Sequence, residues 1–332
     1  MVSTRKLKTL GPLLLVGAMA LGACSSSGDN KSDDGSNKSG GTIGVSVPTV
    51  EGPFFTAMLY GITDEAEKAG YDVTILSAGG YGKVDTQVGQ IETLIAKNVD
   101  ILMVDPADPT VTRGPIERAV AQGITVVGAG DPAPGANGSA SAAHCDVGKD
   151  LAKGAETLLP DGGEIGVLAG PAGAHWSTER LRCFKEAIAD TDLKIITEQA
   201  TDPDVAKGLS TASDFLQRFP TIDLLYGADD TVGVGAAKAV EAANKCDKTL
   251  VLTAVFGEQA ESLMKKNCVN YDVALQPVLI GREAVKLAVA IKSGDKPAET
   301  ELAVPTVAVT PENVSTVDIS TIRAPENWKP KL

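Results

Sequence analysis

The stretch DVTILSAGGYGKVDTQVGQIETLIAKNVDILMV, residues 72–104, decides the fold. It opens with a β-rich run at 72–77 and closes with an apolar run at 100–104, and the segment 84–97 between them has helical periodicity. One face of that segment is apolar and is formed by Val84, Val88, Ile91, Leu94 and Ile95. Continuously apolar runs are typical of strands that are covered on both faces. The stretch therefore predicts a strand, a helix and a second strand of one parallel sheet.

The same alternation extends outward on both sides of this stretch. A first group of four strands is predicted at 43–47, 72–77, 100–104 and 124–130. A second group is predicted at 164–170, 193–200, 223–230, 250–257 and 269–275. Helical segments of about 10–16 residues join successive strands. We therefore expect an α/β protein built from two doubly wound parallel-sheet lobes.

Polar, glycine-rich loops follow most of the predicted strands. Examples are PTVEGP at 48–53, DPADP at 105–109 and GADD at 227–230. Ligands of parallel sheets gather at the carboxyl ends of the strands. Two groups of such loops predict two lobes whose open ends face each other and enclose a ligand.

Composition excludes several classes of protein. The chain has 332 residues, with 30 Lys and Arg against 43 Asp and Glu, a net charge of −13 and two histidines. A nucleic-acid binder needs a basic surface, which this chain lacks. A zinc enzyme with several imidazole ligands is hard to build from His144 and His175 alone. The apolar content excludes disorder over most of the length and leaves a globular protein of about two domains.

The N-terminus has the pattern of an export signal. Residues 1–9 are basic and residues 10–23 are almost wholly apolar, but the apolar run is shorter than the about 20 residues that a membrane-spanning helix needs. Leu21-Gly22-Ala23-Cys24 resembles a bacterial lipobox, so we expect a signal peptide at 1–23 and lipid on Cys24. Residues 24–41 are polar and predict a flexible tether. The expected location is the outer face of the bacterial membrane.

Four further cysteines follow in the body of the chain: Cys145, Cys183, Cys246 and Cys268. An even number in an exported protein favours two disulfides, for which three pairings exist. Proximity in sequence and the order of elements favour Cys145 with Cys183 and Cys246 with Cys268. Four buried free thiols are the alternative.

Several segments together resemble the type I periplasmic sugar-binding proteins, the ribose/galactose-binding group of ABC-transporter receptors. The resemblance covers residues 42–310. The segments that carry it are GPFF at 52–55, ITVVGAGD at 124–131, AGPAGAHWSTERLRCF at 169–184, KGLSTASDFLQRFPTIDLLYGADDTVGVGAAKAV at 207–240 and VALQPVLIGREAVKLA at 273–288.

The resemblance implies two lobes joined by a hinge of three chain crossings. The N-terminal lobe would comprise 42–145 and 277–305, the C-terminal lobe 146–276 and 306–325, and the tail 326–332. It also implies a monomeric receptor that captures a small sugar or polyol, closes by hinge motion and delivers it to the membrane subunits of an ABC permease. Such a receptor has no catalytic step, cofactor or metal. The alternatives are a sensor module for a membrane kinase or chemoreceptor, a binder of an amine-bearing solute, and an enzyme on an α/β scaffold.

Carried over by resemblance, the candidate ligand-binding residues are Phe54, Phe55, Asp131, Asp229 and Gln276. The loops at the strand ends add Trp176 and, as weaker candidates, Glu51, Tyr81 and Asp202. Each has a purely structural alternative: one of the two phenylalanines belongs to the core, Trp176 packs as a loop cap, the exposed carboxylates are solvated, and Asp229 caps the helix that follows unless Asp230 does so.

The sequence also departs from the family pattern. The usual Asp-Arg pair reads Gly130-Asp131, the position of a second pocket Arg is Thr178, and the Asp of the usual GFDG turn is Phe256. We therefore expect a pocket poor in arginine and rich in aromatic and acidic groups.

Three other patterns are too weak to carry a function. Gly233 and Gly235 form half of a dinucleotide fingerprint, but Asp229 and Asp230 would repel a pyrophosphate. His175 with Ser177 and Asp202 is the one possible centre of a catalytic triad. Asp105, Asp108 and Asp131 lack the spacing of an EF-hand loop, so turns and helix caps are their expected roles.

Overall fold

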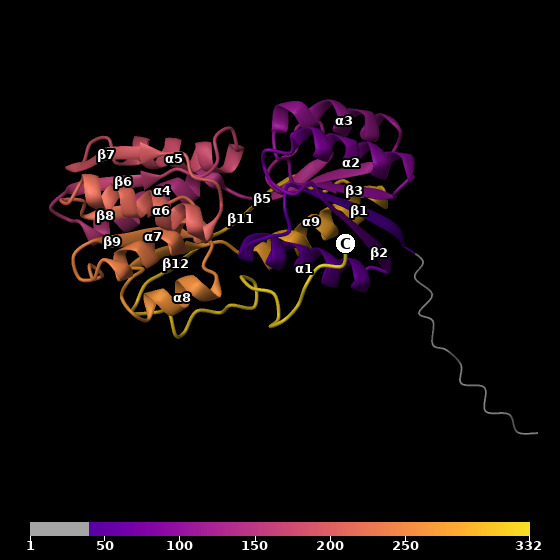
Figure 1. Ribbon diagram of the computed structural model, residues 1–332. Coiled ribbons are helices and arrows are strands. Elements are labelled where there is room, and N and C mark those ends of the chain that lie inside the picture. The colour runs from indigo at the N-terminus through magenta and orange to yellow at the C-terminus, as the bar shows by residue number, and fades with distance from the viewer. Residues whose placement is uncertain (1–39) are drawn as a thin grey trace, which may run out of the picture. The chain divides into compact units, whose positions relative to one another are not determined.

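The computed structural model describes residues 40–332 (Figure 1). The expected signal peptide, Cys24 and the tether up to residue 39 lie outside the described residues. The first strand begins at Gly41, so the last residue assigned to the tether belongs to the fold. Among residues 40–332, every helix is too short or too polar to cross a bilayer.

The first sheet has six strands in the order β11-β5-β4-β3-β1-β2, all parallel. The strands are β1 (Gly41–Val47), β2 (Tyr71–Ser77), β3 (Ile101–Val104), β4 (Thr125–Gly130), β5 (Gly138–Ala142) and β11 (Glu301–Val304). Helices α1 (Pro53–Lys68) and α9 (Pro277–Lys292) pack together on one face, and α2 (Val84–Ala96) and α3 (Pro109–Ala121) on the other (Figure 1).

Strand β3 shows why the strands are continuously apolar. Ile101 and Met103 belong to the apolar cluster on the α1 and α9 side of the sheet. Leu102 and Val104 point the other way, into the cluster formed with α2 and α3. Because successive side chains enter opposite layers, both must be apolar. This confirms the prediction of helices on both faces.

The second sheet also has six strands, in the order β12-β10-β9-β8-β6-β7. They are β6 (Gly163–Leu168), β7 (Leu193–Gln199), β8 (Leu224–Gly227), β9 (Leu250–Ala254), β10 (Tyr271–Ala274) and β12 (Val307–Val309). Helices α4 (His144–Leu158) and α5 (His175–Ala187) pack together on one side, while α6 (Val205–Arg218), α7 (Asp230–Ala242) and α8 (Glu258–Met264) share the other apolar cluster.

The prediction of four strands in the first group was wrong, because β5 and β11 complete that sheet. Strand β12, also unpredicted, pairs antiparallel with β10, so the second sheet is not wholly parallel. Strand β5 reads GSASA and lacks the large β-branched residues that mark a strand, yet it is fully buried. Strands β11 and β12 have four and three residues, too few to show a period.

The chain passes between the two sheets three times, after β5, after β10 and after β11. The C-terminal segment, residues 310–332, contacts elements of both sheets. Arg323 donates hydrogen bonds to the carbonyl oxygens of Phe256 and Gly257, each at 3.0 Å, beside the second sheet. Trp328 packs edge-on against Tyr60 of α1, with ring centroids 5.5 Å apart. The segment therefore adds a non-covalent link to the three crossings.

Candidate functional site

A cavity of about 510 Å³ lies at the carboxyl ends of strands from both sheets. Eight of the nine candidate ligand-binding residues line it: Glu51, Phe54, Phe55, Tyr81, Asp131, Trp176, Asp202 and Asp229. The ninth, Gln276, is not among the lining residues. Its side-chain amide instead donates to the Pro305 carbonyl at 2.9 Å and accepts from the Thr321 hydroxyl at 2.8 Å. Gln276 thus connects two chain crossings with the C-terminal segment.

Four aromatic rings form one wall of the cavity. Phe54 and Phe55 meet edge to face at 5.4 Å, Phe55 lies 6.4 Å from Tyr81, and Tyr81 lies 6.2 Å from Trp176. Phe55 is buried in the core and Phe54 is half-buried against it. Trp176 lies in the first turn of α5, not in a loop, and is buried. This wall suits the C–H face of a small ring or chain.

Asp229 and Asp230 have separate roles. Asp229 is the N-cap of α7, where its carboxylate accepts from the Val232 backbone N–H and the Thr231 hydroxyl, each at 2.9 Å. Asp230 accepts from the Gly257 N–H at 2.8 Å, and burial raises its pKa to about 7. The alternative that Asp230 caps the helix is therefore wrong. Asp229 both caps the helix and faces the cavity.

Two of the three weaker candidates, Glu51 and Asp202, are exposed residues at the edge of the cavity. Glu51 is exposed, and its backbone N–H is held by the Thr49 hydroxyl at 3.0 Å. Asp202 forms an ion pair with Lys207 at 2.6 Å, and both side chains are more than half exposed. Exposed pairs of this kind contribute little to stability.

The expectation of a pocket poor in arginine was wrong in one respect, because Arg180 lines the cavity and is 3% exposed. Its Nη1 donates to the Ala228 carbonyl at 2.9 Å, and its guanidinium carbon lies 4.8 Å from the Trp176 ring centroid. Trp176 and Arg180 are four residues apart in α5, so both project from the same face of the helix. Thr178, the position considered in the sequence, is exposed on another face.

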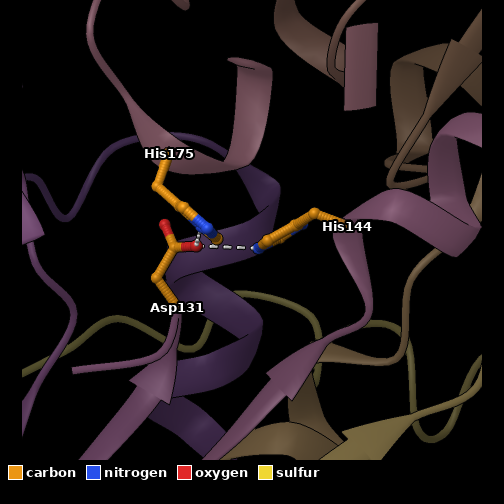
Figure 2. A group of neighbouring side chains, drawn as sticks. All are labelled: Asp131, His144 and His175. Atoms are coloured by element: carbon orange, nitrogen blue, oxygen red, sulfur yellow. Dashed lines mark hydrogen bonds and ion pairs between the residues drawn. The ribbon is translucent and has the colours of Figure 1, made fainter. Parts of the chain in front are cut away.

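Asp131 is the centre of a buried polar cluster (Figure 2). Its Oδ1 lies 2.9 Å from His144 Nε2 and 3.0 Å from His175 Nδ1, while its backbone N–H donates to Asp105 Oδ1 at 3.1 Å. The two histidines begin α4 and α5 beside the second sheet, whereas Asp131 follows β4 of the first. The three ligand atoms lie within 4.8 Å of one another, so among residues 40–332 this is also the group that could hold a metal ion.

The charges of this cluster are mutually dependent. Burial raises the pKa of Asp131, but the two imidazoles outweigh it and bring the pKa below its usual value. Burial and the neighbouring Asp131 charge raise the pKa of Asp105 well above its usual value. The hydrogen bond to Asp131 raises the pKa of His175, whereas burial lowers that of His144. Of the two carboxyl groups, Asp131 is therefore the one that ionises more readily, and Asp105 keeps its proton to higher pH.

Close packing of α4 on α5 brings the two histidines together. A Cβ atom at Gly148 would lie 2.2 Å from the Arg180 carbonyl oxygen, so only glycine allows this approach. The sulfur atoms of Cys145 and Cys183 are paired one turn away, with Cα atoms 5.2 Å apart. The other pair joins Cys246 to Cys268. Sequence reasoning did not place His144 or Arg180 in the cavity, or His175 beside it on Asp131, although the spacing of Trp176 and Arg180 was a usable signal.

The turn after β9 explains why Phe256 stands where the family pattern has an Asp. Phe256 is fully buried beneath Arg323, 4.7 Å from its guanidinium carbon, and does not line the cavity. Val255 lines the cavity instead, with a φ angle of 98° that non-glycine residues rarely adopt. Such strain is often found at ligand sites.

Residues 43–296 match the family of the periplasmic binding protein domain, which is most of the chain. The chain belongs to this family. The resemblance to type I periplasmic sugar-binding proteins and the predicted fold class are thus confirmed.

Named relatives of this periplasmic binding protein are sugar receptors. It is 31% identical over 302 residues to the ribose import binding protein of Bacillus subtilis, covering 88% of this chain and 96% of that protein. It is 31% identical over 263 residues to the D-allose-binding periplasmic protein of Escherichia coli, covering 75% and 84%. A sugar ABC transport substrate-binding protein from Bordetella parapertussis superposes with a TM-score of 0.81 at 25% identity, covering 87% and 95%.

Proposed function

We propose that this periplasmic binding protein is an exported, lipid-anchored receptor that captures a small sugar or polyol and delivers it to an ABC permease, with no catalytic step. The observation that carries the proposal is the cavity, which joins an aromatic wall to buried polar groups. The named relatives support a sugar ligand. A glycerol-bound solute-binding protein from Mycobacterium smegmatis, with a TM-score of 0.78 at 25% identity and covering 86% of this chain and 99% of that one, supports the wider class of polyols.

The polar groups suit hydroxyl recognition because they offer both acceptors and donors. Asp131 and Asp229 provide carboxylate oxygens at the cavity wall. Arg180 Nε is buried and has no acceptor among residues 40–332. A hydroxyl can donate to the first kind of group and accept from the second. Enclosure by the aromatic wall provides the apolar contact that orients a sugar ring.

Two substitutions at Asp229 separate ligand binding from helix capping. Asn caps a helix about as well as Asp, so Asp229→Asn should keep the stability of the free protein while reducing sugar affinity about 10-fold or more. Asp229→Ala should also lower the free energy of unfolding by about 1 kcal/mol. A thermal-shift screen with D-ribose, D-allose and myo-inositol, followed by calorimetry, measures both quantities.

The matched control for this pair is Asp108, which caps α3 away from the cavity. Asp108→Ala should lower stability without changing sugar affinity. The proposal of a sugar receptor fails if none of the three probes stabilises the wild-type chain. If Asp229→Asn binds sugar as tightly as the wild type, the Asp229 carboxylate is not a ligand-binding group.

Anchoring through Cys24 is the second part of the proposal. In the bacterial host, Cys24→Ser should move the protein from the membrane fraction to the soluble exported fraction, because thioether-linked lipid needs the cysteine sulfur. Cell fractionation with immunodetection, and metabolic labelling with palmitate, measure this. Cys246→Ser, a cysteine in the folded body, is the control that should keep the label. Label retained in Cys24→Ser would contradict the anchor.

We further propose that residues 42–145 with 277–305, and 146–276 with 306–325, are the lobes that close on the ligand as one monomer. The three chain crossings support this division. Export would also oxidise the two cysteine pairs. Titration of free thiols in the purified protein tests that part, and the expected number of free thiols in the folded body is zero.

A further inference from the structure

The chain contains two histidines, and both contact the same oxygen of the same carboxylate. His144 and His175 come from helices of the second sheet, and Asp131 from the end of a strand of the first. Asp131 and His144 are each at least nine-tenths buried, whereas His175 is half-buried. The contact therefore joins the loop after β4 of the first sheet to the first turns of α4 and α5 beside the second sheet.

Arg180 determines where the protons of this cluster lie. Its Nη2 is 3.4 Å from Nδ1 of His144, and a guanidinium can only donate. Nδ1 of His144 is therefore the acceptor, and its Nε2 carries the proton that faces Asp131 2.9 Å away. His175 donates from Nδ1. A metal ion on His144 Nε2 would need that proton removed and would lie near the Arg180 charge, so the metal-free arrangement, with protons on both rings facing Asp131, is favoured.

Asp131 consequently has one occupied and one free oxygen. Oδ1 contacts both imidazoles, whereas no hydrogen bond is made to Oδ2 by any residue in 40–332; Figure 2 shows both dashed contacts ending on the same oxygen. Asp131 also lines the cavity. A ligand hydroxyl can therefore donate to Oδ2 without displacing either histidine.

We propose that His144 and His175 are positioning residues that hold Asp131 ionised and oriented, so that the cavity selects neutral polyols over amines. The inference rests on the proposed function, because it concerns the ligand class of the same cavity. His175 beside Asp131 supplies a positive charge when protonated. The other charged groups facing His175 are His144 from α4 and Glu179 of its own helix, with Arg180 behind His144.

The sign of the pH dependence distinguishes the two ligand classes. Enclosing a neutral sugar removes Asp131 from water, which costs less while His175 is protonated. Sugar affinity should therefore be highest at acid pH and fall as the pH rises through the raised pKa of His175, by at most about tenfold per pH unit for one proton. A cationic ligand would pair with Asp131 itself and compete with the imidazolium, so its affinity would rise with pH.

The experiment measures dissociation constants by calorimetry from pH 5.5 to 9 with the best binder among D-ribose, D-allose and myo-inositol, and with choline as a permanently charged probe. His175→Asn places an amide N–H where Nδ1 stands but cannot titrate. It should bind the sugar within about threefold of the wild type at alkaline pH, where His175 is neutral, and show no pH slope. His175→Ala should weaken binding about 10- to 100-fold. Lys185→Asn, a surface change on the same helix, should retain the wild-type slope.

Several results would overturn the inference while leaving the proposed sugar receptor intact. One is sugar affinity that is flat or rises with pH in the wild type. Another is a pH slope that persists in His175→Asn, since the titrating group would then lie elsewhere. Tight choline binding that strengthens as the pH rises would show that the cavity selects cationic ligands instead of neutral polyols. Stoichiometric Zn²⁺ binding that is lost in both His175→Ala and His144→Ala would make the cluster a metal site.

Discussion

Arg180→Leu is expected to reduce sugar affinity about 30- to 1,000-fold, the loss that follows from truncating one member of a buried charged network. Arg180 is the buried cation of the cavity, and Asp131 and Asp229 lie near enough to affect its pKa. Burial lowers the pKa of Arg180 and these carboxylates oppose that effect. Leucine preserves much of the volume but leaves the Ala228 carbonyl without its donor and the carboxylates less compensated.

Calorimetry on Arg180→Leu and on Arg180→Lys measures this loss. Lysine keeps the positive charge, but it lacks the planar guanidinium that both donates to the Ala228 carbonyl and stacks over the Trp176 ring. We therefore expect an intermediate affinity. The control is Arg218→Leu, which removes an exposed arginine over Phe219 on α6. Unchanged affinity in Arg180→Leu with an intact melting profile would show that the guanidinium does not act on the ligand.

Removing the Cys145–Cys183 pair is expected to have the largest effect on stability. The cysteines are separated by 38 residues, and opening a loop of that length costs about 3–4 kcal/mol in the chain-entropy account. The pair also clamps α4 to α5, which carry His144, His175 and Arg180. The double variant Cys145→Ala/Cys183→Ala should therefore lose sugar affinity as well as stability.

The second pair provides the matched control. Cys246 and Cys268 are separated by 22 residues, and neither lines the cavity. The double variant Cys246→Ala/Cys268→Ala should lose about 3 kcal/mol of unfolding free energy and keep its sugar affinity. Denaturant unfolding and calorimetry on both variants separate the two effects. Equal affinity losses in both would contradict a specific role for the α4–α5 clamp.

Long elements with a clear period could be predicted from the sequence. Residues 84–97 were expected to form a helix, and α2 spans Val84–Ala96. The strands that were missed have no such signal. The GSASA run of β5 is recognisable only from the strands beside it, β4 and β11, and the β11 residues that pair with it lie 162 positions further along the chain. Burial within a sheet can override weak local propensity.

The site shows a similar division. Residues next to strand ends, such as Phe55, Trp176 and Asp229, could be placed at the cavity because parallel strands deliver their following loops to one edge. His144 and Arg180 could not, because they reach the cavity from helices whose packing is set by Gly148. That contact joins positions distant in sequence, and no local pattern reveals it; the helical spacing of Arg180 from Trp176 was the one local signal for Arg180.

The C-terminal segment has a practical consequence for watching the protein work. The chain has two tryptophans, and the structure puts one in the cavity wall and the other, Trp328, on α1. Their fluorescence signals differ in origin, since Trp176 faces the ligand site and Trp328 senses the docking of the segment on Tyr60. Replacing Trp328 with Phe leaves a single emitter in the cavity. Ligand binding can then be followed by the intrinsic fluorescence of Trp176, without an added label.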